Sequence, residues 1–241
     1  MGRHENGKVF GKPGFCMVAE IERPQADIVG RVGSFPVAIL GDGLGRRAIM
    51  DAGIKPLDAS LTMVGTAITV EVHPADNLMI HAALKIAREG DVLIVNAHGD
   101  LGHGIWGELT TQMAIRKKLA GIVIDGAVRD CRELATCGFP VFARGINPTG
   151  GGKDGPGQIN LPTSCGGVAV LPGDIVVGDA DGVIIVPARQ AEEAIRLAEA
   201  RIAAESKRMK AIKEGPVEGI YPDWLISTLR TSGVLAEGDE L

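Results

Sequence analysis

The chain has 241 residues, enough for one large domain or two small ones. Its formal net charge is −5 and its basic residues are scattered, which argues against a basic nucleic-acid-binding face. No uninterrupted apolar segment approaches the ~20 residues of a membrane-spanning helix, so we expect no membrane partner. Aromatic residues make up only 3%, so the expected core consists of Ala, Val, Ile and Leu.

The cysteine pattern gives no sign of a metal or redox motif. No pair has a C-x-x-C spacing, which excludes the usual zinc and thioredoxin-type signatures. Free thiols in a reducing cytoplasm are therefore expected. The four cysteines are Cys16, Cys131, Cys137 and Cys165.

The N-terminal segment is polar and glycine-rich, and it lacks the apolar core of a signal peptide. We expect residues 1–15 to form a flexible arm, followed by a short helix over 17–31. The apolar run 37–40 leads into the glycine-rich turn 41–45. A dinucleotide fingerprint would need glycine where Arg46 stands, so this turn does not indicate nucleotide binding.

The middle third alternates between apolar runs and helix-like segments. This alternation predicts an α/β fold with mainly parallel strand pairing. The expected strands are 64–72, 91–95, 122–124 and 139–143, and the expected helices are 77–89, 107–119 and 129–136, with a loop over 96–105.

The last third begins with a long glycine-rich loop over 145–159. Three expected strands follow, at 168–170, 174–177 and 182–186. The acidic segment Gly178–Gly182 lies between the last two and has the composition of a turn, because its later positions lack the ligands of a calcium loop.

A long amphipathic helix is predicted over 188–213, beginning after Pro187. Glu205 falls on its apolar line, so the helix either emerges into solvent there or aims an acid at another group; the pattern favours solvent. The extension 215–241 carries Tyr221 and Trp224, which we expect to dock on a neighbour or on the same domain. Residues 16–214 are predicted to form one catalytic domain.

The adjacent pair Arg129-Asp130 follows an apolar run that ends at Asp125-Gly126. An arginine can hold a carboxylate in two places, and an aspartate can hold a hard divalent cation. A site that acts on a small keto-acid needs both groups. The alternative is an ordinary pair at a helix start, where an acid suits the helix dipole.

The segment Gly104–Thr110 leads a glycine-bearing loop directly into a predicted helix. The first N–H groups of a helix lack partners within it and form an anion site. The alternative is a plain helix start, with Glu108 as a favourable first-turn acid.

Neighbouring parallel strands carry their loops on the same edge of a sheet, where ligands bind. We therefore expect Gly104–Thr110 and Arg129-Asp130 to face one crevice. Asn77 and His81, at the preceding helix start, are candidates for the same place, although a structural role for His81 is an equal alternative. His98 and His103 have a spacing that fits no familiar metal site, and we interpret them as surface histidines.

Three segments together resemble a known enzyme family. They are Pro74-Ala-Asp-Asn-Leu-Met-Ile-His81, Trp106-Gly-Glu-Leu109 and Val123-Ile-Asp-Gly-Ala-Val-Arg-Asp130. They resemble the 4-hydroxy-4-methyl-2-oxoglutarate and 4-carboxy-4-hydroxy-2-oxoadipate aldolases, which share a fold with the regulator of ribonuclease E activity. The resemblance continues through Gly138–Val141, Pro172–Val177 and Asp179–Val183, and covers roughly residues 20–210.

The resemblance implies a layered β/β/α domain of the swivelling type with a long C-terminal helix, assembled into homotrimers or homohexamers. It implies a class II pyruvate aldolase, dependent on Mg²⁺ or Mn²⁺, with oxaloacetate decarboxylase side activity.

The resemblance also assigns roles to residues. Asp130 would bind the metal, partly through waters, and Arg129 would contact the pyruvoyl part of the substrate. Glu108 would lie near the metal's waters, although many relatives carry Asp there. An acid from the adjacent subunit's C-terminal helix approaches the metal in such aldolases, and Glu205 is the candidate. The backbone amides that would hold the substrate carboxylate belong to Gly107, Glu108, Leu109 and Thr110.

The chemistry is coherent on its own terms. Retro-aldol cleavage and β-decarboxylation share the enolate of pyruvate, which a divalent cation stabilises as a Lewis acid. Arg129 adds a fixed positive charge beside the oxyanion, and no lysine Schiff base is needed. No protein base for the 4-hydroxyl proton is evident from the sequence, so we interpret a metal-ordered water as the base; the pH-rate profile of Glu108→Gln tests Glu108 in that role.

Two rival functions remain. A non-enzymatic regulator that binds ribonuclease E would share the fold, but such regulators lack a metal-binding carboxylate after the arginine, and this chain has Asp130. A methyltransferase would need a nucleotide loop after a first strand, and 41–45 is the only candidate. The distal part of the substrate does not follow from the sequence, although the loops 96–106 and 145–159 are expected to shape its pocket.

Overall fold

The computed structural model describes residues 3–4, 7–236 and 239. The chain divides into two compact units, Met1–Ala198 and Glu199–Leu241. The first unit contains the predicted α/β alternation, and the sheets that position the candidate site belong to it.

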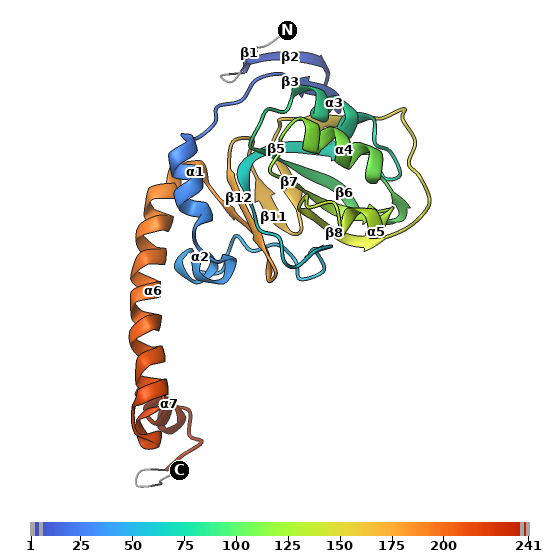
Figure 1. The fold of residues 1–241 in the computed structure, drawn as a ribbon. Coiled ribbons are helices and arrows are strands. Elements are labelled where there is room, and N and C mark those ends of the chain that lie inside the picture. The colour runs from blue at the N-terminus through green and yellow to red at the C-terminus, as the bar shows by residue number, and fades with distance from the viewer. Residues whose placement is uncertain (1–2, 5–6, 237–238, 240–241) are drawn as a thin grey trace. The chain divides into compact units, whose positions relative to one another are not determined.

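Four parallel strands form the centre of the first unit (Figure 1), in the order β5-β6-β7-β8. Helices connect them in sequence, as the alternation predicts. The strands are β5 (Met63–Val72), β6 (Asp91–Gly104), β7 (Gly121–Val128) and β8 (Val141–Ile146), and the helices between them are α3 (Leu78–Ile86), α4 (Glu108–Arg116) and α5 (Cys131–Leu134).

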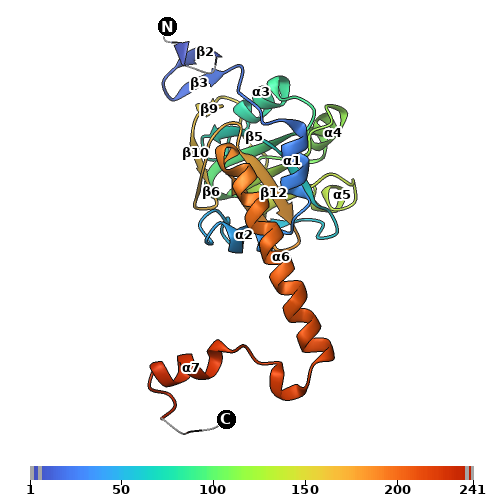
Figure 2. The ribbon, with the colours of Figure 1, turned by 90° about the vertical axis from the view of Figure 1, so that its left-hand side faces the viewer.

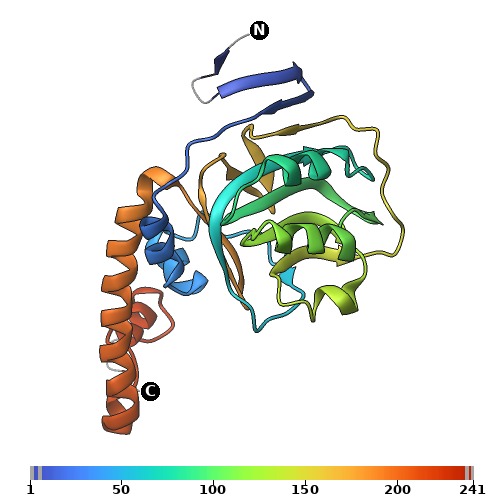
Figure 3. The same ribbon diagram turned by 45° about the horizontal axis from the view of Figure 1, so that its top comes forward.

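The three connecting helices lie on one face of this sheet, and Figure 3 shows α3 and α4 side by side over it. Alternate strand residues point to this face because side chains in a strand alternate in direction. Leu93, Val95, Ile122 and Ile124 belong to the core beneath the helices, whereas Val123 packs on the opposite face.

The opposite face carries a second layer of strands. These are β10 (Thr163–Cys165), β11 (Val168–Val170), β12 (Ile175–Asp179) and β13 (Gly182–Val186). Strand β5 joins the layers, because its first residues pair with β12 and its last three pair with β9 (Gly157–Ile159). Hydrophobic residues of β11, β12 and β13 complete the core on this side.

A helical layer covers β12 and β13 from outside. Figure 2 shows α1 beside β12 and the first turns of α6. This layer consists of α1 (Ala26–Gly33), α2 (Val37–Gly43) and residues 191–198 of α6 (Ala191–Glu214), which follows a 3₁₀ turn at Ala188–Gln190. The predicted α/β class with layered sheets and a long C-terminal helix is confirmed.

The N-terminal predictions need correction. The described residues of the expected arm form β1 (Arg3–His4) and β2 (Gly7–Lys12), while residues 1–2 and 5–6 lie outside the described part. The helix expected over 17–31 begins only at Ala26, because 15–18 form strand β3 (Phe15–Val18), which pairs with β2 and β9. Pro24 explains the late start, since proline disfavours helix at the preceding residue.

Three further boundaries differ from expectation. The run 37–40 is helical, so no strand precedes the glycine-rich turn 41–45. Strand β7 continues through Asp125-Gly126 to Val128, because these residues pair with the extended β6 and with β8 instead of forming a turn. The expected loop 96–105 belongs largely to β6, which runs on through two register shifts. The short strand β4 (Lys55–Pro56) pairs with β8.

The second unit contains the rest of α6, a 3₁₀ turn (Val217–Gly219) and α7 (Trp224–Thr231). All buried residues of α6 lie before Glu199, whereas Ile202, Met209 and Ile212 are exposed. Tyr221 and Trp224 are also exposed in the single chain. Residues 237–238 and 240–241 of the predicted extension lie outside the described part. None of the helices described is both long and apolar enough to cross a bilayer.

Candidate functional site

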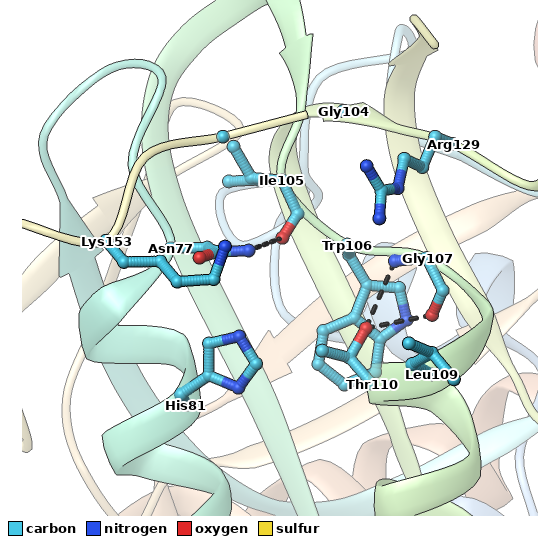
Figure 4. A pocket seen from close by; sticks show the side chains of 11 residues that line it. Asn77, His81, Gly104, Ile105, Trp106, Gly107, Leu109, Thr110, Arg129 and Lys153 are labelled. Atoms are coloured by element: carbon cyan, nitrogen blue, oxygen red, sulfur yellow. Dashed lines mark hydrogen bonds between the residues drawn. The ribbon is translucent and has the colours of Figure 1, made fainter. Parts of the chain in front are cut away.

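A pocket opens at the carboxyl ends of β5, β6 and β7, where the sequence placed the crevice. Figure 4 shows the side chains around it. Its volume is about 170 Å³, below the roughly 300–1,000 Å³ of sites for larger ligands, which suits a small acid. The lining residues are Asn77, His81, Gly104, Ile105, Trp106, Gly107, Leu109, Thr110, Arg129, Gly151 and Lys153.

Helix α4 presents its N-terminus to the pocket. Two of its four predicted amides are used inside the protein: Gly107 N–H donates to Thr110 Oγ1 (3.1 Å), and Glu108 N–H donates to Asp130 Oδ2 (3.0 Å). Within the part of the chain that the structure describes, the N–H groups of Leu109 and Thr110 have no protein acceptor. These two amides are therefore the free anion donors of the helix start.

Polar contacts below the pocket hold this helix start in place. The Thr110 and Thr111 hydroxyls both donate to Gly107 C=O, at 2.8 and 3.0 Å. Trp106 is fully buried, and its Nε1–H donates to Thr111 Oγ1 at 2.7 Å. The amides that face the pocket are thus fixed before any ligand arrives, which reduces the entropy cost of binding.

Asp130 has a left-handed backbone, with φ at 56°. This conformation costs about 1–3 kcal/mol for a non-glycine residue, and such strain clusters at functional sites. Asp130 occupies the N-cap position of α5 but makes no side-chain cap to that helix. Its Oδ2 turns to α4 instead, and Oδ1 has no hydrogen-bond partner among the described residues. Asp130 therefore stands at a helix start, as the alternative interpretation expects, but its carboxylate accepts the first N–H of α4 and does not cap α5.

Arg129 lines the pocket, and Asp130 lies beside it at the rim. Arg129 Nε is 3.6 Å from Asp130 Oδ2, and the two side chains are 43% and 39% exposed. The absence of a side chain at Gly107 leaves room for the Arg129 and Asp130 side chains. A Cβ on residue 107 would clash with both, at 2.3 Å from Asp130 Oδ2 and 3.0 Å from Arg129 Cγ. A Cβ on Gly150 would lie 2.8 Å from an Arg129 terminal nitrogen.

Asp76 organises the opposite side of the pocket. Its buried carboxylate accepts the N–H of Leu78 at the start of α3 (2.8 Å) and the N–H of Asp154 (2.7 Å). It therefore joins α3 to the loop that follows β8. Sequence reasoning missed this role, although Asp76 stands within a motif of the resemblance.

Asn77 links α3 to the pocket floor through its amide, which donates to Ile105 C=O at 3.2 Å. Its Oδ1 is buried and has no hydrogen-bond partner among the described residues. An unsatisfied buried acceptor is costly for the fold. Asn77 lies where the sequence predicted it.

The glycine-rich loop 147–156 closes the pocket from above. Gly104 N–H donates to Thr149 C=O (2.7 Å), and Asn77 N–H donates to Gly152 C=O (3.0 Å). This register brings Lys153 into the lining. We expected this loop to shape the pocket, but we did not predict Lys153 as a lining residue. A single lysine within Gly150–Gly155 is the signal that indicates it.

His81 lies one turn after Asn77 on α3 and lines the pocket next to Lys153 (Figure 4). Partial burial, and then the nearby Lys153 ammonium, hold the pKa of His81 below its usual 6.5. The imidazole is therefore neutral at neutral pH.

None of the three predicted acids, Asp130, Glu108 and Glu205, is among the lining residues, although Asp130 lies beside Arg129. Glu108 is exposed and touches the site through its backbone N–H. Glu205 belongs to the second unit and pairs with Arg201 at 2.9 Å. No group of three or more His, Cys, Asp or Glu in the described ranges has the arrangement of a metal site. His103 pairs with Asp100, as a surface histidine would.

The fold and the site define a class: an α/β protein with a small cationic pocket, formed by a helix N-terminus and an arginine at the ends of parallel strands. A family model described as "RraA-like: Aldolase/RraA" matches residues 37–185. The chain belongs to this RraA-like aldolase family.

Individual relatives agree with this assignment. The chain is 37% identical over 194 residues to a protein of Halalkalibacterium halodurans named "Putative 4-hydroxy-4-methyl-2-oxoglutarate aldolase", covering 80% of this chain and 92% of that protein. The crystal structure of Streptomyces coelicolor RraAS2, described as an unusual member of the RNase ES inhibitor RraA family, superposes with a TM-score of 0.70. It is 32% identical and covers 78% of this chain and 98% of its own.

A third relative bears on the methyltransferase alternative. A Geobacillus kaustophilus structure titled as an S-adenosylmethionine:2-dimethylmenaquinone methyltransferase superposes with a TM-score of 0.59 and is 29% identical, covering 63% of this chain and 94% of its own. In this chain the candidate nucleotide loop, 41–45, begins within α2 (Val37–Gly43) and does not follow a strand. The geometry expected of a nucleotide loop is therefore absent at 41–45.

Proposed function

We propose that the protein is a divalent-metal-dependent (class II) pyruvate aldolase. Its substrate would be a 4-hydroxy-2-oxo acid, either 4-carboxy-4-hydroxy-2-oxoadipate or 4-hydroxy-4-methyl-2-oxoglutarate, cleaved to pyruvate and a second keto-acid. Oxaloacetate decarboxylation would accompany cleavage. The observation that carries the proposal is that Arg129 and two free α4 amides line one pocket, with Asp130 beside Arg129 and the start of α4.

The binding of the pyruvoyl part follows from this geometry. The N–H groups of Leu109 and Thr110 are suited to the substrate carboxylate, since they are unpartnered and lie at the positive end of α4. Arg129 would place its guanidinium beside the keto oxygen, where negative charge develops when the carbon–carbon bond breaks. Buried Trp106 and the two threonines keep these donors in position.

The donor set fits a hard divalent cation. Asp130 would hold Mg²⁺ or Mn²⁺ through the carboxylate oxygen that no protein group occupies, with waters and substrate oxygens as further ligands. One protein carboxylate is ordinary for Mg²⁺, which keeps most of its waters. The cation would supply Lewis-acid stabilisation of the enolate charge. Exposed Glu108 stands at the start of α4, where its backbone N–H donates to Asp130, and its carboxylate would order such waters.

The far end of the pocket favours an acidic substituent on the substrate. Lys153 and Arg129 are the basic side chains beside His81 among the lining residues, and no carboxylate is among them. A second carboxylate on the substrate would therefore meet Lys153. This supports a dicarboxylic or tricarboxylic substrate over an uncharged one.

A coupled lactate dehydrogenase assay for pyruvate tests the proposal. The two hydroxy-oxo acids and oxaloacetate are each supplied with Mg²⁺ or with EDTA. We expect Mg²⁺-dependent release of pyruvate from at least one hydroxy-oxo acid and from oxaloacetate. No release from any of the three, or equal release in EDTA, would contradict it.

The alternative, a non-enzymatic regulator that binds ribonuclease E, rests on the shared family. Asp130 distinguishes the enzyme from the regulator, because a regulator does not need a carboxylate on a strained backbone that is available to bind a metal. Under the enzyme proposal, Asp130→Ala abolishes metal-dependent pyruvate release. If the variant released pyruvate as the native chain does, the case for the enzyme would fail.

We also propose that the protein acts as a homotrimer or homohexamer in the cytoplasm. Exposed apolar side chains on the second unit, among them Met209 and Trp224, support self-association, and the unpaired cysteines fit a reducing compartment. In such an assembly Glu205 of a neighbouring copy would approach the metal. It would then give up its ion pair with Arg201 of its own chain. Analytical ultracentrifugation tests the assembly, and a monomer at micromolar concentration would contradict it.

A further inference from the structure

The wall of the pocket opposite Arg129 carries one titratable side chain without a hydrogen-bond partner. His81 points into the pocket from α3 (Figure 4), and its ring nitrogens meet no hydrogen-bond partner among the residues that the structure describes. Its backbone N–H donates to Asn77 C=O at 3.2 Å. His81 is half-buried, and the described protein groups leave its ring nitrogens free to contact a ligand in the pocket.

The surroundings keep His81 ready to accept a proton. Lys153 from the loop and Arg129 from the end of β7 are the charged groups among the lining residues, and both are cations. No lining carboxylate stabilises an imidazolium. Burial and Lys153 both favour the neutral ring, which leaves one nitrogen lone pair available.

The position of His81 is fixed by its neighbours. Asn77 connects α3 to Ile105 through its side chain and to Gly152 through its backbone. These contacts fix the start of α3, and His81 lies across the pocket from Arg129 (Figure 4). A group in this place faces the part of the substrate beyond the pyruvoyl fragment.

We propose that His81 is the base that removes the proton from the substrate's C4 hydroxyl in aldol cleavage. The inference rests on the proposed aldolase function and replaces a metal-ordered water as the base. The unprotonated imidazole nitrogen takes the hydroxyl proton, and the O–H electron pair forms the C4 carbonyl. The C3–C4 bond breaks, and its electron pair forms the enolate of pyruvate. Water then protonates C3, and His81 returns its proton to the resulting hydroxide.

The two reactions of the site separate this role from a structural one. Oxaloacetate has no C4 hydroxyl, and its decarboxylation releases carbon dioxide without a base. Both reactions still need Arg129 and the enolate. His81→Gln is therefore expected to lower kcat/KM for cleavage by about 100-fold or more. The same substitution leaves decarboxylation within about twofold of the native rate.

The pH profile gives a second readout. In the native protein, kcat/KM for cleavage is expected to fall as pH drops through the pKa of His81, which lies below 6.5, because protonation removes the base. This acidic limb is absent from cleavage by His81→Gln. His73→Gln is the matched control, since His73 is exposed and lies outside the pocket lining.

The outcomes are distinct. Selective loss of cleavage with retained decarboxylation supports the proposal. Equal loss of both reactions, or loss of neither, overturns it. A native protein that performs neither reaction defeats the aldolase function itself. His81→Asn is measured beside His81→Gln, with thermal melts of both, so that a folding failure of one variant leaves the test valid.

Discussion

Two arginine–aspartate pairs in this molecule have the same chemistry and opposite geometry. Arg23 holds Asp91 through two hydrogen bonds of 2.8 Å, and the Asp91 side chain is 1% exposed. Arg129 and Asp130 are 3.6 Å apart, and each is about two-fifths exposed. The first pair satisfies itself, whereas the second leaves a guanidinium and one carboxylate oxygen available.

The difference teaches how to distinguish structural from functional ion pairs. Arg23–Asp91 attaches the segment before α1 to the start of β6, and Asp91 also accepts the Arg88 N–H at 2.7 Å. Nothing is left for a ligand. Asp130 instead holds a left-handed backbone and omits the cap of its own helix. Strain together with spare bonding capacity marks the site.

The largest expected effect comes from breaking the buried pair. Arg23→Met leaves the Asp91 carboxylate buried without a counter-charge and should lower the free energy of unfolding by about 3–5 kcal/mol. Urea unfolding measures it. The control is Arg31→Met, which removes an exposed pair with Glu192 and should cost no more than about 1 kcal/mol. Equal losses in the two variants would contradict the structural role of Arg23.

The second effect concerns activity. Arg129→Lys keeps the charge but loses the planar pair of donors, and should lower kcat/KM for pyruvate release by about 10²–10³-fold. The unfolding free energy should change by less than about 1 kcal/mol, because the pair is half-exposed. Arg132→Lys on α5 is the control with unchanged activity. A stability loss that matches Arg23→Met would mean that the Arg129 pair is structural.

The third effect is a smaller loss of activity, and it tests whether Arg129 and Asp130 need the space that Gly107 leaves beside them. Gly107 has an extended backbone with φ at −156°, which any residue tolerates, so Gly107→Ala adds only a clash with Asp130 and Arg129. We expect pyruvate release to fall by about 10–100-fold, since a displacement near 1 Å has that effect. Gly30→Ala, where the added Cβ meets nothing within 4 Å, is the control. Full activity of Gly107→Ala would show that the rim geometry is not needed.

The central sheet and the position of Arg129 at its edge were predictable from the sequence. The apolar runs at the start of β6 and β7, alternating with helix-like segments, predicted the parallel sheet, and the sheet edge predicted that Arg129 would meet α4. The motif from Pro74 to His81 predicted that α3 would reach the same crevice.

The rest depended on long-range contacts that local pattern does not encode. Residues 15–18 became a strand because β9 lies beside them, and Val37–Leu40 became helical in a layer that packs on β13. Lys153 entered the pocket through the loop's pairing with Gly104, 49 positions earlier in the chain (153 − 104). The use of the Glu108 N–H by Asp130 is likewise a tertiary contact, and it reduced the predicted set of free amides.

Deuterium exchange into pyruvate tests the central claim most directly, because it reports enolate formation without any assumption about the natural substrate. Pyruvate is incubated with the protein in D₂O, with Mg²⁺ or EDTA, and the methyl signal is followed by proton NMR. The account predicts loss of the methyl signal that depends on Mg²⁺ and disappears in Asp130→Asn. Exchange at the native rate in Asp130→Asn, or exchange that EDTA does not affect, would contradict it.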